Sequence, residues 1–555
     1  MYNTEVPHQT SAEVLSQVSS YFTAVDNAIA MGDTNKRYQP ATNTCYGPPV
    51  PVQANSYTTV VISPTADNTA DIYNGYIYAE MKCKFTLKAD STKGTEFKSN
   101  DYIDKNPYAL WVGFKDAMDA IEKYEILANG ITIYTQNQAI EESFVTACGL
   151  PDSAKRCDPY SRVRHKDVFN RKWESGASCG ALIAWDKVNS GTSWTSGDQT
   201  IKLKIDLRRF LPLSNIKYLP AFAGKIELRL YFSTAGMVCT PVMPEWKLPY
   251  AQYIHNLSDI TAEFVPLGEH FDMFSQYTAP TTASIDAVNG EGQPVTATSI
   301  IATPGSLAVN TFSLHADKDY SLQICETVIH CFGLASERYD ALVQKYMQTP
   351  LTFPTQTLAF TQMSNLLNQS NGKTVQTVTP RFVDSIFLLF PLKPTYRTCY
   401  KNPSFKTIQL QCGGYGSIPD IAFGTQKSAR LLESVQNALN VNCDTVGLNK
   451  DILRSLQADS SDFHKAVVSK DSTNFIVGFA TETDGTFQQG QTSNTPITYT
   501  LCVDQDASSH YAKKVTTTPI MGMLIDSTFS IQIRSDGAPP VVEVGAFDIT
   551  SPVMM

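Results

Sequence analysis

Short runs of strand-forming residues, separated by turn signals, recur along the chain and constrain its fold more than any other feature. In the first half these runs lie at 57–63, 76–87, 109–114, 121–128, 131–136, 201–207 and 225–233. Asn129-Gly130 separates two of them, and because both residues tolerate positive φ, this spacing predicts a hairpin with a type I′ turn. Many short strands with few helices between them favour β-sandwiches over a parallel α/β sheet.

The chain is too long for one hydrophobic core. It has 555 residues, whereas single cores stop growing at roughly 250–300 residues, so two large domains are expected. A Pro-rich crossing at 240–249 puts the expected boundary near residue 250. The prediction is residues 1–50 as an N-terminal helical arm and linker, 51–250 as the first sandwich and 251–555 as the second.

The second half repeats the strand-rich pattern of the first. Its expected strands lie at 259–267, 321–331, 351–360, 382–390, 406–411, 474–480, 497–503 and 528–534, with one helix at 336–347. Residues 121–135 and 406–420 both read as strand, glycine turn, strand, and 224–232 has a counterpart at 527–534. The similar separation of the two pairs predicts a tandem duplication of one sandwich.

Residues 10–30 form the clearest predicted helix, which opens with a capping box of Thr10 and Glu13. An apolar stripe follows at three- and four-residue spacing, made of Val14, Val18, Phe22, Val25 and Ile29. We expect this stripe either to pack on its own domain or to be the contact face of an arm that reaches a neighbouring subunit or an internal membrane. Residues 38–51 hold four prolines, which disfavour a helix or a central strand, so a linker is expected there.

The acidic character of the chain argues against nucleic-acid binding as its main task. The formal net charge is −9, whereas such binding relies on Lys and Arg that displace counterions from phosphates. The basic stretch 155–172 is an exception, which either faces a genome or an acidic neighbour or is a solvated loop. The N-terminus has no basic start with an apolar core, and no run approaches the roughly 18 apolar residues that span a bilayer, so we expect synthesis in the cytosol.

No motif in the sequence predicts catalysis, a cofactor or a bound metal. Ser178 has G-x-S-x-G spacing, but residues 170–175 before it are too polar for the buried strand of a nucleophile elbow. Two groups of candidate metal ligands lack any usual zinc spacing: Cys148, Cys157, His165 and Cys179, and Cys325, His330 and Cys331. Most of the twelve cysteines are expected to be reduced and buried.

Three further clusters have both a structural and a functional interpretation. One is a cluster of four carboxylates, which could serve acid–base chemistry but is predicted to be a solvated face beside the hairpin. It comprises Asp116, Asp119, Glu122 and Glu125. Two aromatic groups could be a sugar-binding platform but are expected to be core and interface anchors: Trp173, Trp185 and Trp194, and Tyr396, Tyr400 and Tyr415.

Four runs from both halves carry a family resemblance. They are WVGFKDAMDAIEKYEILANGITIYTQNQAIEESF (111–144), IDLRRFLPLSNIKYLPAFAGKIELRLYF (205–232), ERYDALVQKYMQTPLTFPTQTLAF (337–360) and FVDSIFLLFPLKPTYRTCYKNPSFKTIQL (382–410). In content and order they resemble double-jelly-roll major capsid proteins, most of all those of Polinton-like viruses and adintoviruses, which are distant relatives of the adenovirus hexon. The resemblance spans both domains and implies an all-β chain of two tandem eight-stranded jelly-roll sandwiches, with a short N-terminal helix and a few helices in loops.

The resemblance also implies a function. A major capsid protein of this kind is not an enzyme; it trimerises into pseudo-hexagonal capsomers that tile an icosahedral shell around a double-stranded DNA genome. The implied partners are further copies of the chain, penton and minor capsid proteins and an internal membrane, without sequence-specific nucleic-acid binding, and the implied location is the virion after synthesis in the host cytoplasm.

Two alternatives remain open. One is a β-sandwich protein that binds or hydrolyses carbohydrate as a monomer. The other is a double-jelly-roll scaffold that forms a transient lattice on a membrane and is later shed.

Overall fold

The structure is a computed structural model of the whole chain. The residues that it describes are 11–31, 39–43, 50–51, 55–64, 68–83, 85–89, 109–149, 160–161, 179–184, 193–195, 199–233, 236, 238–242, 269–270, 277–278, 287–288, 294–295, 312–316, 321–363, 372–378, 383–391, 397–398, 400, 405–412, 416–417, 421–422, 435–439, 476–480, 497–505 and 518–546. The expected strand at 259–267 lies outside them.

The first sandwich contains a four-stranded antiparallel sheet, called here the β13 sheet, whose neighbouring strands are β3, β13, β7 and β8. Their bounds are Tyr57–Val61, Ile226–Phe232, Ile121–Ala128 and Ile131–Gln136. The predicted hairpin is confirmed: Ala128 pairs with Ile131, and the turn residues Asn129 and Gly130 have φ of 51° and 84°.

The second sheet of this sandwich, the β4 sheet, has the order β1, β20, β4, β11, with β12 added to β4 and β2 added to β20. The bounds are Gln39–Asn43 (β1), Val50–Pro51 (β2), Thr69–Cys83 (β4), Gln199–Asp206 (β11), Tyr218–Pro220 (β12) and Ser321–Phe332 (β20). Strands β1 and β2 fall inside the segment expected to be a linker, so that prediction is wrong there. Both pair along β20, where proline is tolerated because an edge strand leaves some N–H groups unpaired.

Alternation of apolar and polar residues explains why these two sheets face each other. On β13, Ile226, Leu228 and Leu230 are fully buried, whereas the residues between them are partly exposed. Strand β11 repeats the pattern with Ile201 and Leu203. Successive strand residues point to opposite faces, so both sheets present an apolar face to one core, and each fully buried Ile or Leu contributes about 1.5–3 kcal/mol.

The second sandwich has the strand exchange of a jelly roll. The β29 sheet has the order β21, β29, β23, β27, and the β28 sheet has the order β22, β28, β24, β25; β30 and β26 extend them. The bounds are Leu351–Gln362 (β21), Gly372–Val378 (β22), Val383–Leu389 (β23), Phe405–Cys412 (β24), Gly416–Ser417 (β25), Ile421–Ala422 (β26), Val477–Ala480 (β27), Ile497–Gln505 (β28), Ile520–Gln532 (β29) and Val541–Ala546 (β30). In each sheet the four main strands lie side by side in the order first, fourth, second, third along the chain, and the β13 sheet has this order too. The shared order supports the predicted duplication.

The boundary between the sandwiches differs from the one expected. Strands β19 (Phe312–Ala316) and β20 follow residue 250, yet they pair with β5 (Phe85–Ala89) and β4, which precede it. The expected division near residue 250 does not match these pairings. The Pro-rich crossing is therefore not where the chain passes from one set of sheets to the other.

Smaller sheets and helices complete the described part of the chain. Two further four-stranded sheets have the orders β10, β5, β19, β16 and β15, β14, β6, β9, and β17 pairs with β18. Their bounds are Ala109–Gly113 (β6), Gly180–Ala184 (β9), Ser193–Thr195 (β10), Val238–Val242 (β14), Glu269–His270 (β15), Tyr277–Thr278 (β16), Ala287–Val288 (β17) and Pro294–Val295 (β18). The α-helices include α1 (Ser11–Ala30), α2 (Ala139–Gly149) and α8 (Ser336–Gln348), and residues 435–438 are helical as well. Short 3-10 helices are η1 (Ala117–Ala120), η2 (Leu207–Arg209), η3 (Leu211–Leu213) and η4 (Ala221–Ala223). The predicted fold class, all-β with a few helices, is confirmed, and the arrangement is consistent with a double jelly roll.

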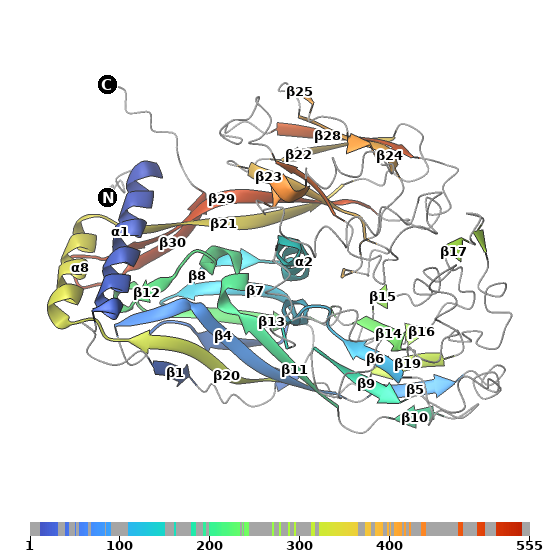
Figure 1. Cartoon of the computed structure of the whole chain (residues 1–555), viewed down its shortest axis with the longest axis horizontal. Coiled ribbons are helices and arrows are strands. Elements are labelled where there is room, and N and C mark those ends of the chain that lie inside the picture. The colour runs from blue at the N-terminus through green and yellow to red at the C-terminus, as the bar shows by residue number, and fades with distance from the viewer. Residues whose placement is uncertain are drawn as a thin grey trace.

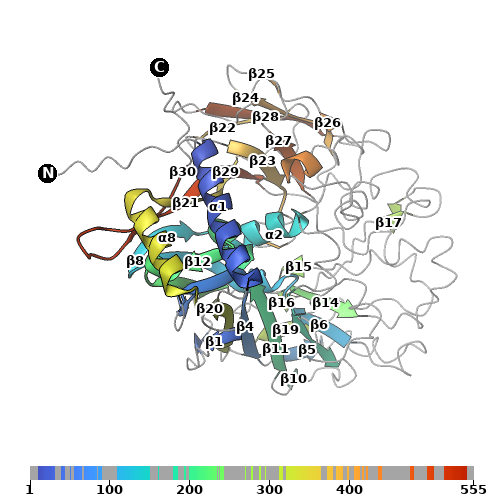
Figure 2. The same cartoon turned by 60° about the vertical axis from the view of Figure 1, so that its left-hand side comes forward.

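The two sandwiches lie against each other with the β13 sheet facing the β29 sheet (Figure 1). Helix α2 lies between these sheets, and α1 and α8 cover one end of the junction, as the turned view also shows (Figure 2). One apolar core runs from the first sandwich into β21 and β29, where it includes Phe353 and Phe529. The junction is thus part of the folded core and not a flexible link.

Candidate functional site

Helix α2 contacts both sandwiches through an apolar face and a pair of glutamates. Ile140, Phe144 and Cys148 repeat at four-residue spacing and form an apolar face. Phe144 packs on Tyr400 with ring centroids 4.3 Å apart, in the core cluster of the second sandwich. The first turn instead carries Glu141 and Glu142, where the partial positive charge of the helix N-terminus favours carboxylates.

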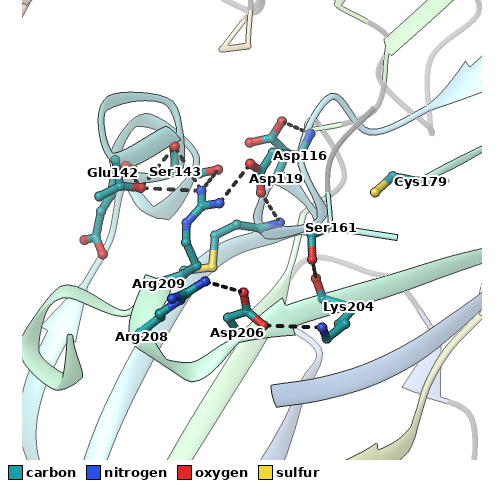
Figure 3. Close-up of polar contacts among 12 residues, drawn as sticks. Asp116, Asp119, Glu142, Ser143, Ser161, Cys179, Lys204, Asp206, Arg208 and Arg209 are labelled. Atoms are coloured by element: carbon teal, nitrogen blue, oxygen red, sulfur yellow. Dashed lines mark hydrogen bonds and ion pairs between the residues drawn. The ribbon is translucent and has the colours of Figure 1, made fainter. Parts of the chain in front are cut away.

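Arg209 is the centre of a buried polar cluster on the first-sandwich side of α2 (Figure 3). Its Nη1 lies 3.0 Å from Oδ2 of Asp116, and both side chains are less than a tenth exposed. Its Nη2 donates to the Ser143 carbonyl at 3.2 Å. A buried charge needs a partner and hydrogen bonds to offset its lost hydration, and Arg209 obtains both from η1 and α2.

Asp116 and Asp119 form a capping box around η1. The Asp116 carboxylate accepts from Met118 N at 3.0 Å, and the Asp119 carboxylate accepts from Asp116 N at 3.1 Å. Burial, reinforced by the negative charge of Asp116, raises the pKa of Asp119 to about 7. Its charged form therefore competes with a neutral form near neutral pH.

Glu142 connects α2 to both sandwiches. Its Oε1 accepts from the Tyr124 hydroxyl at 2.8 Å, and its Oε2 accepts from Gln136 Nε2 at 2.6 Å. Gln136 Nε2 also donates across the junction to the Leu358 carbonyl on β21 at 2.8 Å. Burial raises the pKa of Glu142 to about 7, although the hydrogen bonds from Tyr124 and Gln136 oppose this.

A second arginine links the sandwiches from the other side. Arg397, in the second sandwich, contacts Glu141 of α2 at 2.6 Å and Glu122 of β7 at 3.0 Å. Burial lowers the pKa of Arg397, but the hydrogen bond and charge of Glu141 outweigh this, so the pKa is raised overall. Lys115 donates to the Thr398 carbonyl at 3.1 Å. Polar bonds as well as apolar packing therefore hold the sandwiches together.

The structure corrects the interpretation of the acidic run near the hairpin. Asp116, Asp119 and Glu125 are 5%, 4% and 8% exposed, so the predicted solvated face is wrong for them. Glu125 is paired with Lys123 at 2.7 Å and Arg229 at 3.0 Å on β7 and β13. These carboxylates are held by cations and backbone N–H groups, an arrangement that fixes the positions of the elements that carry them.

The N-terminal stripe packs on its own chain. Val18 and Val25 are buried, and Phe22 and Ile29 pack against the same core; the Val14 side chain lies outside the described residues. The Phe22 ring lies 6.0 Å from Tyr218 of the first sandwich and 5.9 Å from Phe353 of the second. The structure favours the own-domain alternative, and contact of this face with a neighbouring subunit or a membrane stays a prediction.

The other sequence candidates do not gather into a site in the described part of the chain. Cys148, Cys179 and Cys331 are buried thiols, and Tyr400 is a buried anchor as expected. The following residues lie outside the description: Ser178, Cys157, His165, the side chain of Cys325, the side chain of Trp194, Trp173, Trp185, Tyr396 and Tyr415. Within the described ranges no group of three or more His, Cys, Asp or Glu side chains is placed to hold a metal ion. No helix in these ranges is long and apolar enough to span a membrane.

Sequence reasoning singled out Asp116, Asp119 and Tyr400 but missed helix α2 and the two arginines of the junction. Helix α2 left a signal in the four-residue spacing of its apolar residues behind a pair of glutamates. Arg209 and Arg397 left none, because they lie 93 residues from Asp116 and 256 residues from Glu141.

Comparison with known proteins gives structural similarity only. No family model matches the chain, and no curated protein matches it. The mavirus major capsid protein covers 94% of this chain and 93% of its own length, with 10% identity and a TM-score of 0.45. The Sputnik virophage structure covers 92% and 89% with 10% identity and a TM-score of 0.45, and VP54 of PBCV-1 covers 92% and 97% with 10% identity and a TM-score of 0.41. Similarity at this level does not by itself establish a common function.

Proposed function

We propose that this chain is a major capsid protein whose trimers form pseudo-hexagonal capsomers of an icosahedral shell around a double-stranded DNA genome. The observation that carries the proposal is the pair of sandwiches with one shared strand order, fixed against each other by the α2 junction. Three copies of such a block present six similar lobes, and six similar sides can tile a closed shell through repeated edge contacts.

The rigidity of the junction matters for this role. A lattice contact made by one sandwich positions the other only if the two do not rotate independently. Contacts such as Arg397 to Glu141, which is partly buried, and Gln136 to Leu358, which is buried, oppose that rotation. Domains joined by small polar interfaces, in contrast, move by default.

The finer parts of the proposal rest on the four sequence runs that resemble double-jelly-roll capsid proteins. They support a proposed kinship with the capsid proteins of Polinton-like viruses and adintoviruses, with the virion as the proposed location after synthesis in the host cytoplasm. Further copies of the chain are its main partners, and penton proteins, minor capsid proteins and an internal membrane are the others. The proposed role is structural and involves no catalysis.

Light scattering coupled to size-exclusion chromatography tests the proposal. We expect a stable trimer of three times 61.2 kDa. A monomer that retains or hydrolyses glycans would contradict it and favour the carbohydrate alternative. Protein analysis of mature particles then separates a capsid protein, which stays in the particle, from a scaffold that is shed.

A matched pair of variants tests the part played by the junction. Arg397→Gln removes the ion pairs to Glu141 and Glu122, whereas Arg534→Gln removes an exposed pair with Asp536 on the β29–β30 turn. We expect the first to reduce the trimer fraction and the second to leave it unchanged. Equal trimer fractions in both variants would show that assembly does not depend on the ion pairs of the junction, and would contradict this part of the proposal.

A further inference from the structure

The first-sandwich side of the α2 junction holds more negative than positive charge. In the described residues, the buried carboxylates of Asp116 and Glu142 lie near Arg209, and the buried carboxylate of Asp119 lies near Asp116. Lys115, which is partly exposed, is the other cation near them. Arg397 does not relieve this excess, because it is paired with Glu141 and Glu122.

Burial makes this excess costly when every carboxylate is ionised. Like charges at short range in a low-dielectric interior repel strongly, and one of them takes up a proton instead. Asp116 keeps the ion pair with Arg209. Asp119 and Glu142 are the groups left to bind protons, and their pKa values of about 7 agree with that geometry.

We infer that the α2 junction is a proton-dependent latch, which holds the two sandwiches together while Asp119 and Glu142 are protonated and loosens when both ionise. Ionisation of Glu142 favours a state in which its carboxylate reaches water. Reaching water separates Glu142 from Gln136, which also bonds to the Leu358 carbonyl of β21. Asp119 transmits it through Asp116, whose partner Arg209 also holds the Ser143 carbonyl on α2.

The groups that face the two carboxyls come from every element packed around them. Lys115, Asp116 and Ser143 act on Asp119, and Tyr124 of β7, Tyr134 of β8 and Arg209 of η2 act on Glu142. Glu122 of β7 and Glu141 of α2 are paired with Arg397 of the second sandwich. Tyr124 and Tyr134 stay neutral, because burial and the charge of Glu142 raise their pKa well above the ordinary value. A protonated Glu142 can donate to Tyr124, whose hydroxyl rotates to accept.

The sign of the pH dependence follows from the direction of these shifts. The ordinary pKa values are 3.8 for Asp119 and 4.5 for Glu142, and the folded values are about 7. The stabilisation by bound protons is therefore complete below the ordinary values, declines as pH rises and is lost above about 7. The junction is expected to hold most firmly in mild acid and to loosen toward alkaline pH.

Hydrogen exchange of the β21 amides, corrected for the intrinsic rate at each pH, measures opening of the latch in the full chain. Between pH 5.5 and 7.5 we expect the equilibrium constant for opening to rise by roughly 20-fold for each of the two carboxyl groups that becomes hydrated in the open state. The double variant Asp119→Asn, Glu142→Gln should flatten this dependence, whereas Glu543→Gln, on the exposed side of β30, should preserve it.

The single variant Glu142→Gln provides a second measurement, which does not require the double variant to fold. About half of the pH dependence of β21 exchange should remain in it, because Asp119 can still ionise. The latch is wrong if protection of β21 is constant or rises over this range, or if both variants keep the full dependence. A failure of this test leaves the capsid proposal untouched, because the exchange is measured within one chain whether or not copies assemble.

Discussion

Replacing Arg209 with alanine is the sharpest test of how the junction is stabilised. The substitution removes the 3.0 Å ion pair with Asp116 and the hydrogen bond to the Ser143 carbonyl. It leaves the Asp116 carboxylate buried without its cation, and breaking a buried pair by removing one partner costs about 3–5 kcal/mol. We therefore expect a large loss of stability from this single substitution.

Calorimetry measures that loss of stability as a fall in the melting temperature. For 555 residues that unfold cooperatively, the unfolding entropy is roughly 1.2 kcal/mol/K, so the melting temperature should fall by roughly 2.5–4 °C. If the sandwiches melt separately, the affected transition has a smaller entropy and shifts further.

Arg208→Ala is the matched control, because it changes the neighbouring residue of η2. Arg208 is 37% exposed and lies 3.6 Å from Asp206, and such surface pairs contribute about 0–1 kcal/mol. Its melting temperature should fall by less than about 1 °C. Equal shifts in the two variants would refute the reasoning, because they would show that burial of Arg209 adds nothing.

Three further substitutions test other parts of the structure by the same melting assay. Tyr21→Phe should be neutral or raise stability by about 1 kcal/mol, because the Tyr21 hydroxyl is buried with no hydrogen-bond partner among the described residues. A loss of stability of more than about 1 kcal/mol would contradict this and indicate that the hydroxyl has a partner. Gly236→Ala should destabilise by more than about 2 kcal/mol, because the added Cβ would overlap the carbonyl oxygen of Asp119. Asn129→Ala should cost about 1–2 kcal/mol, through loss of the bond to Lys225 N at 2.9 Å and strain at φ 51°; unchanged stability in either variant would contradict its rationale.

Local signals in the sequence predicted the elements that depend on near neighbours. The hairpin around Asn129-Gly130 was predictable because turn geometry and flanking alternation act within a few residues. The helix at 11–30 was predictable from its apolar stripe, which also supplied the own-domain packing of Val18 and Val25 as one of two alternatives.

The junction was not predictable, because its residues acquire their environment from distant parts of the chain. A run such as Asp116 to Glu125 looks solvated until Arg209, Arg397 and Arg229 arrive from later strands and loops. Pairing of β20 with β4 is equally invisible locally, since it joins residues on either side of the Pro-rich crossing. Sequence pattern sets which faces are apolar, whereas the identity of the partner is decided by topology.

Imaging of the purified protein by negative-stain electron microscopy tests the central claim most directly. If three copies of a rigid pair of sandwiches form the capsomer, class averages should show a ring with threefold symmetry and six lobes. Isolated particles with two lobes, at concentrations where the protein is otherwise stable, would contradict it.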